Sequence, residues 1–178
     1  LLFAGADMAA GTVSVRKIVS ISNTTDRTYV PGPEPTNLLR FGLPPDSRAL
    51  QFETGLLVVD IVQVDRGFAF LTSVPPGEHE VMYSYEFPYS GAEAEVIESF
   101  PYGAADLRVL AFSELGTLSS DQLDASDDVT IGTRVYQLIQ ASDLPRGARI
   151  SIVLRGLPEP SLVDRLGRGL RDTRFEYA

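Results

Sequence analysis

The chain has 178 residues, of which 44% are hydrophobic and 22% are charged, as in a globular protein of one domain or two very small ones. Its formal net charge of −9 argues against binding to nucleic acid or to an anionic membrane surface, because both need basic patches. The lack of cysteine excludes disulfides, thiolate catalysis and cysteine metal sites.

The chain opens with the small and apolar stretch "LLFAGADMAAG" at residues 1–11. Its apolar residues follow no strand period, which predicts an N-terminal extension without an ordered place in the domain. Leu1, Leu2 and Phe3 are therefore candidates for contact with a partner. The stretch also resembles the end of an export signal, or the middle of a longer protein. No apolar run reaches the roughly 18 residues that a membrane helix needs.

Alternation of apolar and polar residues begins in the next stretch, "GTVSVRKIVSIS" at residues 11–22. The alternation changes parity between Lys17 and Ile18, which predicts a β-bulge at that point. A shorter strand is predicted at residues 37–44. Residues 56–65 are almost continuously apolar and predict a strand that is covered on both faces.

The clearest strand is predicted at residues 78–87, after a Pro-Pro-Gly turn. Its odd positions are mostly apolar and its even positions are mostly acidic or small, as in a half-buried antiparallel strand. We expect Val81, Tyr83 and Tyr85 to be buried, with Glu80 and Glu86 outside. The single histidine, His79, lies on the apolar side and is predicted to be a packed or rim residue rather than a catalytic one.

Three further strands are predicted at residues 106–112, 133–140 and 147–156, and the chain as a whole is predicted to hold nine to ten strands. Turn signals separate them and no helical pattern intervenes. This spacing is typical of a two-sheet antiparallel β-sandwich of the Ig-like, Greek-key type. The β-sandwich domain is assigned to residues 12–158.

A helical pattern occurs only at the C-terminal end, and it defines the last predicted part, a short helical segment at residues 159–178. Leu162, Leu166 and Leu170 share one stripe of this helix. Two glycines weaken the helix, so we expect the three leucines to gain order by docking on a partner.

The acidic stretch at residues 119–128 is predicted to be a polar loop joining the two halves of the sandwich. Its carboxylates offer a weak candidate calcium site, because Ca²⁺ prefers clustered oxygen ligands. The glycine and terminal glutamate of an EF-hand loop are absent, and a solvated loop is the alternative. The candidate ligands are Asp121, Asp124, Asp127 and Asp128.

Other candidate chemistry has a simpler structural interpretation. Glu93, Glu95 and Glu98 could take part in a carboxylate pair for glycoside hydrolysis, but acidic residues on the outer face of a sheet explain them as well. Sugar binding usually uses exposed aromatic rings, and without tryptophan only tyrosines remain for this purpose. Asn23 begins a formal N-T-T glycosylation acceptor, which also fits a polar turn. We predict no catalytic residue and no cofactor.

The stretches "VSISNTTDRTYV", "LLRFGLPPDSRALQFETG" and "DRGFAFLTSVPPGEHEVMYSYEFPYSG" resemble an uncharacterised group of bacterial extracytoplasmic β-sandwich domains. The resemblance covers roughly residues 13–155 and depends on turn motifs. Domains of this group often follow a carboxypeptidase-regulatory-like module and often precede a membrane anchor. The resemblance implies a periplasmic or extracellular location, with a membrane tether as an open question, and it carries over no catalytic residue.

Together these observations favour a non-enzymatic structural or protein-binding subunit outside the cytoplasm. Its expected partners are other protein subunits of a larger assembly, with self-association left open. Two alternatives remain: a filament or surface-layer subunit that assembles by adding a strand to a neighbour's sheet edge, and a module that binds sugar or calcium.

Overall fold

The computed structural model describes residues 1–32, 38–54, 61–64 and 66–159, and the described chain is entirely β. It contains thirteen strands rather than the nine to ten predicted. The strands are β1 (Leu2–Asp7), β2 (Thr12–Asn23), β3 (Leu39–Gly42), β4 (Arg48–Thr54), β5 (Ile61–Val64), β6 (Gly67–Phe70), β7 (Gly77–Pro88), β8 (Glu93–Phe100), β9 (Ala104–Phe112), β10 (Thr117–Ser119), β11 (Asp124–Ile131), β12 (Arg134–Leu144) and β13 (Ala148–Arg155).

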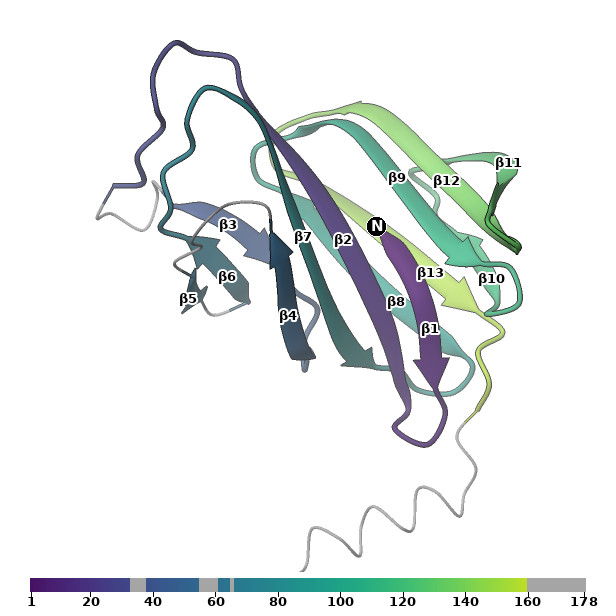
Figure 1. Cartoon of the computed structure of the whole chain (residues 1–178). Helices are drawn as coiled ribbons and strands as arrows, with labels where there is room; N and C mark the ends of the chain where they lie inside the picture. Colours follow the sequence, from purple (N-terminus) through teal and green to yellow (C-terminus); the bar gives the residue numbers. More distant parts are fainter. Residues whose placement is uncertain (33–37, 55–60, 65, 160–178) are drawn as a thin grey trace, which may run out of the picture.

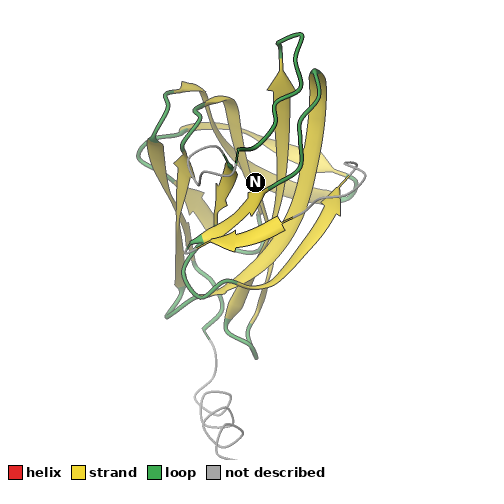
Figure 2. Cartoon of the chain, turned by 90° about the vertical axis from the view of Figure 1, so that its left-hand side faces the viewer, coloured by secondary structure: helices red, strands yellow, loops and turns green. Residues whose placement is uncertain are grey.

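The strands form a sandwich-like arrangement, as the sequence predicted (Figure 1). One layer is a seven-stranded sheet in the order β11-β12-β9-β1-β2-β7-β4. The other side carries two three-stranded sheets, β10-β13-β8 and β3-β6-β5. Figure 2 shows strands, loops and turns but no helix among the described residues, and none of these residues forms a helix able to cross a membrane. The predicted segment 159–178, except for Glu159, lies outside the described residues.

The N-terminal residues are not an extension, and this prediction was wrong. Strand β1 lies inside the seven-stranded sheet, antiparallel to β2 and parallel to β9. The side chain of Phe3 is fully buried in the core. A register shift between Phe3 and Gly5 breaks the regular alternation, and the remaining residues are small. The strand therefore has no readable period in the sequence.

The predicted bulge at Lys17 is also absent. Strand β2 pairs with β7 in unbroken register from Thr12 opposite Pro88 to Asn23 opposite Gly77. The inward positions of β2 continue through Val15 and Lys17, so a lysine occupies a core-facing position. The apparent change of parity arises because the inward residue is charged and the outward residue Ile18 is apolar and exposed.

Strand β7 confirms the prediction for residues 78–87. Val81, Tyr83 and Tyr85 are all at most 1% exposed. Glu80 is exposed, and Glu86 lies at the partly exposed outer face, where its carboxylate is 3.8 Å from Arg48.

Two other predictions need correction. The acidic stretch 119–128 is not a simple loop, because residues from Asp124 onward form strand β11, which pairs with β12. The described part of residues 56–65 is strand β5, where Ile61 and Val62 are 36% and 37% exposed rather than covered on both faces. Among the described strands, β5 pairs only with β6 and lies at the end of its small sheet.

Aromatic rings fill the core between β7 and the sheet β3-β6-β5. Phe68 lies at the centre, with ring centroids 5.2 Å from Phe41, 4.9 Å from Phe52 and 5.0 Å from Tyr83. The contacts with Phe52 and Tyr83 are edge-on, the geometry that aromatic pairs favour. This cluster fixes the small sheet against the large one.

Candidate functional site

A buried ion pair joins the two layers of the sandwich. Lys17 on β2 donates a hydrogen bond from Nζ to Oε2 of Glu98 on β8, at 2.5 Å. The two side chains are only 15% and 5% exposed. Lys17 is the only lysine of the chain, beside 14 arginines among the 15 basic residues. The sequence patterns place Glu98 on an outer face and predict no functional role for Lys17, so this buried pair differs from both expectations.

Two tyrosines of β7 border this pair. The ammonium group of Lys17 lies 5.7 Å from the ring centroid of Tyr83, which is its register partner. The hydroxyl groups of Tyr83 and Tyr85, and the second carboxylate oxygen of Glu98, are buried without a hydrogen-bond partner in the described structure. The charged pair and both hydroxyls thus form one polar cluster inside an apolar core.

Burial and a neighbouring charge act in opposite directions on the pKa of Lys17. Burial by itself lowers the pKa of Lys17, but the carboxylate of Glu98 outweighs burial and leaves that pKa above the value of a free lysine. Burial raises the pKa of Tyr83, and burial together with the charge of Glu98 raises the pKa of Tyr85. The ammonium of Lys17 and the neutral phenols of Tyr83 and Tyr85 are therefore the stable forms at neutral pH.

The Lys17–Glu98 hydrogen bond of this cluster connects the two layers of the sandwich. Each group sits beneath strands on both sides, and Tyr83 and Glu98 are 1% and 4% exposed. A signal in the sequence could have revealed the pair, because Lys17 and Glu98 each occupy an inward position in a strand whose other inward residues are apolar.

On the outer face of the seven-stranded sheet, one cross-strand row holds three adjacent leucines between polar positions, whereas the next rows of β12 and β9 pair Gln140 with Arg108 and Ser142 with Asp106. The members of the first row, in register, are Ser126, Leu138, Leu110, Leu2, Arg16, Ser84 and Gln51, one from each strand. We call Leu2, Leu110 and Leu138 the leucine row. All three are partly exposed, on a face that is usually polar in an antiparallel sheet.

The hairpin formed by β11 and β12 lies at one end of this sheet (Figure 1). We call the turn and its flanking residues, 131–135, the hairpin tip. Ile131 is 54% exposed and Val135 is 41% exposed. Arg134 lies over the ring of Phe112, 5.3 Å from its centroid. The tip thus presents apolar side chains to solvent on a well-paired hairpin.

Both end strands of the large sheet are irregular. Strand β11 carries a register shift between Ser126 and Val129, and β4 carries one between Arg48 and Gln51. At the second shift Ala49 has a φ of 53°, a left-handed conformation that is uncommon for residues other than glycine. Bulges and charges on edge strands hinder the addition of a further strand. Both edges are therefore poor templates for strand addition.

A shallow polar pocket of about 340 Å³ lies on the outer side of β10 and β13. The side-chain amide of Gln122 makes two hydrogen bonds to the backbone of β13. Its Nε2 donates to the carbonyl oxygen of Arg149 at 2.9 Å, and its Oε1 accepts from the backbone nitrogen of Ser151 at 2.9 Å. Arg155 donates to Glu93 at 2.9 Å and to Ser119 at 3.2 Å. Hydrogen bonds thus fix several side chains that line the pocket.

The four candidate calcium ligands do not form a metal site. Asp121 lines the polar pocket, whereas Asp124, Asp127 and Asp128 lie on β11. In the described ranges, no group of three or more acidic or histidine side chains is close enough to hold a metal ion.

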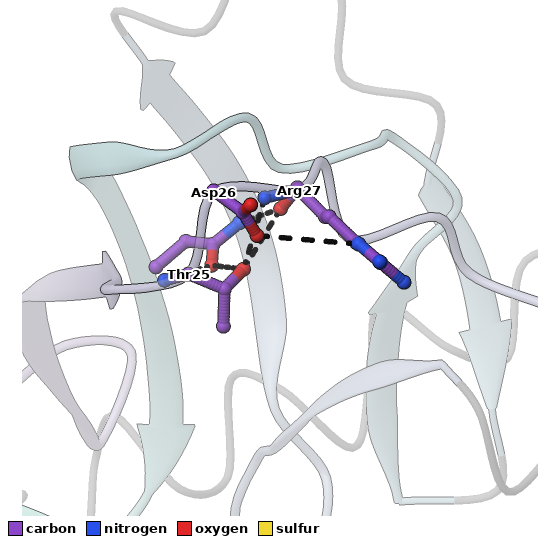
Figure 3. Close-up of polar contacts among 4 residues, drawn as sticks. Thr25, Asp26 and Arg27 are labelled. Atoms are coloured by element: carbon purple, nitrogen blue, oxygen red, sulfur yellow. Dashed lines mark hydrogen bonds and ion pairs between the residues drawn. The ribbon is translucent and has the colours of Figure 1, made fainter.

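The remaining predicted polar residues have structural partners. A ring nitrogen of His79 lies 2.8 Å from the carbonyl oxygen of Pro75, in the turn before its strand. The side-chain amide of Asn23 donates to the carbonyl oxygens of Arg27 and Val74, each at 2.9 Å. Figure 3 shows the adjoining turn, where the Thr25 hydroxyl donates to Arg27 O at 3.0 Å and Asp26 lies 4.0 Å from Arg27. The N-T-T glycosylation motif that begins at Asn23 is thus part of a turn held by its own hydrogen bonds.

The predicted interaction residues fall into two groups. Phe3 is in the core, Leu1 is partly buried against it, and Leu2 belongs to the leucine row. The backbone of Leu1 continues the sheet, since its carbonyl oxygen accepts a hydrogen bond from Leu110 N at 2.8 Å. Leu162, Leu166 and Leu170 lie outside the described residues.

Comparison with known proteins assigns no family. No protein-family model matches the chain, and no curated protein is recognisably similar to it in sequence.

Proposed function

We propose that this chain is a non-enzymatic structural and protein-binding subunit that works outside the cytoplasm, as one part of a larger assembly. The observation that carries the proposal is the hairpin tip. Ile131 and Val135 are exposed at the end of the β11–β12 hairpin, and exposed apolar side chains on a paired hairpin are suited to contact with another protein.

The chemistry of the interior supports the non-enzymatic part of the proposal. The groups with shifted pKa values, Lys17, Tyr83 and Tyr85, are enclosed between the layers. Catalytic groups with shifted pKa values act in clefts that a substrate can enter. The cluster is better suited to holding the two layers in one arrangement.

The test compares two matched isoleucines. Ile131→Asp changes the hairpin tip, and Ile97→Asp changes an isoleucine of β8 that is exposed to nearly the same degree, 51% against 54%. Each tagged variant is purified from the native source after mild cross-linking, and its bound proteins are identified by mass spectrometry. We expect a specific partner to be lost with Ile131→Asp and kept with Ile97→Asp. Equal capture by both variants refutes the hairpin tip as the contact.

The location outside the cytoplasm is supported by the resemblance of the turn motifs to extracytoplasmic domains. Fractionation of the source cells, with an antibody against this chain, tests the location. Recovery in the cytoplasmic fraction alone refutes it.

A sugar-binding module is a second candidate, favoured by the polar pocket beside Gln122. Its volume of about 340 Å³ is at the lower end of the range for small-molecule sites. Hydroxyl groups and the guanidinium of Arg155 offer hydrogen bonds to a polyhydroxylated ligand. A glycan array with the natural chain and Arg155→Ala tests this candidate. Binding that is absent, or unchanged in the variant, refutes it.

A further inference from the structure

The free edge of strand β3 is occupied by a side chain of the same chain. The hydroxyl of Tyr102 accepts a hydrogen bond from Arg40 N at 3.0 Å and donates one to the carbonyl oxygen of Leu38 at 2.6 Å. A neighbouring strand would bond to these same backbone groups. Tyr102 therefore takes the place of a strand at this edge.

Two glutamines close other exposed strand positions in the same way. Gln137 accepts a hydrogen bond from Leu118 N at 3.0 Å and donates one to the carbonyl oxygen of Gly116 at 2.6 Å, at the edge of β10. Gln122 makes the corresponding pair of bonds to β13. Backbone groups need hydrogen-bond partners, and here the chain supplies them from its own side chains.

The remaining edges differ in how they are protected. Strands β4 and β11 carry the register shifts described above, and β8 carries the exposed charges of Glu93 and Glu95, which hinder strand addition. Strand β5 has none of these features. Its register with β6 is unbroken, residues 61–64 contain no charge and no proline, and no described side chain bonds to its backbone. Figure 1 shows β5 at the margin of the molecule.

The register of the small sheet identifies the residues of β5 that face this edge. The backbone N–H of Arg40 points away from β6, because it bonds to the capping tyrosine. Its register partner Ala69 therefore points away from β3 and toward β5, where it lies opposite Val62. The bonding direction alternates along a strand, so the N–H and C=O groups of Ile61 and Gln63 point away from β6, to the free edge.

A second copy of this edge is complementary to the first. If two β5 strands lie antiparallel with Val62 opposite its own counterpart, Ile61 of each copy lies opposite Gln63 of the other. Each outward residue then exchanges hydrogen bonds with an outward residue, so every backbone group that residues 61–64 turn to the edge is paired. The absence of charge in this stretch means that no like charges meet. We propose that the chain forms a twofold dimer by antiparallel pairing of β5 with β5 of a second copy.

The dimer would join two three-stranded sheets into one continuous sheet. Twofold dimers are the commonest closed assemblies, and each copy uses the same surface in them. Interfaces that bury less than about 1,200 Å² are usually weak, so we expect a dimer that forms at high concentration and dissociates on dilution. The proposal does not depend on the hairpin tip, because β5 and β11 belong to different sheets.

The test uses two matched proline variants. Gln63→Pro removes an outward N–H of β5 and leaves the bonds between Val62 and β6 in place. Ile97→Pro removes an outward N–H of β8 in the same way, because its register partner Ser151 bonds to Gln122 rather than to β8. Circular dichroism first compares the fold of both variants with that of the natural chain.

Sedimentation velocity over a concentration series measures the dimer. We expect the natural chain and Ile97→Pro to dimerise equally, and Gln63→Pro to have a dissociation constant at least about tenfold higher. Hydrogen exchange of the natural chain, read by mass spectrometry, gives a second measurement that needs no variant. Exchange at residues 61–64 should slow as the concentration rises.

Several results overturn the proposal. They are a natural chain that stays monomeric, a dimer that Gln63→Pro does not weaken, and a dimer in which exchange at residues 61–64 is unchanged. Growth beyond the dimer contradicts the twofold pairing. If the pure chain is monomeric but residues 61–64 are protected in the complex captured from the native source, a strand of another protein occupies the edge instead.

Discussion

Removal of one member of the Lys17–Glu98 pair should destabilise the protein far more than removal of both. Lys17→Met leaves the carboxylate of Glu98 in the core without its cation, and Glu98→Leu leaves the ammonium without its anion. Breaking a buried pair in this way costs about 3–5 kcal/mol. The double variant Lys17→Met/Glu98→Leu removes both desolvation costs, so we expect its stability to equal or exceed that of the natural chain, by up to about 4 kcal/mol.

The measurement is a double-mutant cycle based on urea unfolding at pH 7, followed by circular dichroism. A matched control is the exposed pair Arg155–Glu93, with a contact of 2.9 Å and side chains that are 59% and 51% exposed. Its coupling energy should be at most about 1 kcal/mol. For Lys17 and Glu98 we expect a coupling above about 5 kcal/mol, from two costly single changes and a neutral double change.

A cost below about 1 kcal/mol for each single variant would contradict a buried pair, because the two charges would then be hydrated in the folded state. A typical domain is stable by only about 5–15 kcal/mol, so a single variant could unfold completely. In that case a folded double variant beside unfolded single variants still demonstrates the coupling.

Further outcomes follow from the same structure. The free energy of unfolding should fall as pH rises above about 10, because Lys17 and Tyr85 keep protons in the folded state that the unfolded state has released. Each of the two groups contributes about 1.4 kcal/mol per pH unit. Urea unfolding at pH 9 and 11 checks this, and equal stability at both pH values contradicts it. Phe3→Ala should cost about 3–5 kcal/mol, and a loss below about 1 kcal/mol would place β1 outside the core. Gly116→Ala should destabilise the protein more than Gly132→Ala. A Cβ at Gly116 would lie 2.2 Å from the Arg155 carbonyl oxygen, whereas a Cβ at Gly132 would have no other atom within 4 Å. Equal melting temperatures of the two variants would contradict this geometry. Calcium should leave the calorimetric melting temperature unchanged, since the described residues hold no cluster of three or more acidic or histidine side chains, and a clear increase would contradict that.

Regular alternation along the chain was sufficient to identify some of the strands that carry the core, among them β7, β9 and β13. In β7 every second residue is apolar, and the predicted burial of Val81, Tyr83 and Tyr85 is confirmed. The same rule failed for β1, because a bulge and small residues remove the period there. It also misled at Lys17, where a charged inward residue gave the appearance of a shifted register.

The candidate site was less predictable than the fold. Lys17 can occupy the core only because Glu98 neutralises it, and the two residues are 81 positions apart in the chain. The hairpin that carries the tip was not predicted, because residues 119–128 were interpreted as a loop. Acidic residues and a bulge remove the alternation from the first half of β11. The leucine row consists of single outward residues from three strands, none of which is unusual by itself.

The sequence by itself determined that the protein is built of strands, where its clearest strands lie, and which side of β7 faces the core. These properties depend on neighbours within one strand, because successive side chains point to opposite faces. The tertiary structure alone decided that β1 joins the two halves of the large sheet, that Lys17 meets Glu98, and that three leucines lie side by side on an outer face. The alternation within a strand specifies a direction for each side chain but not the strand beside it, and these three features all depend on which strands are neighbours.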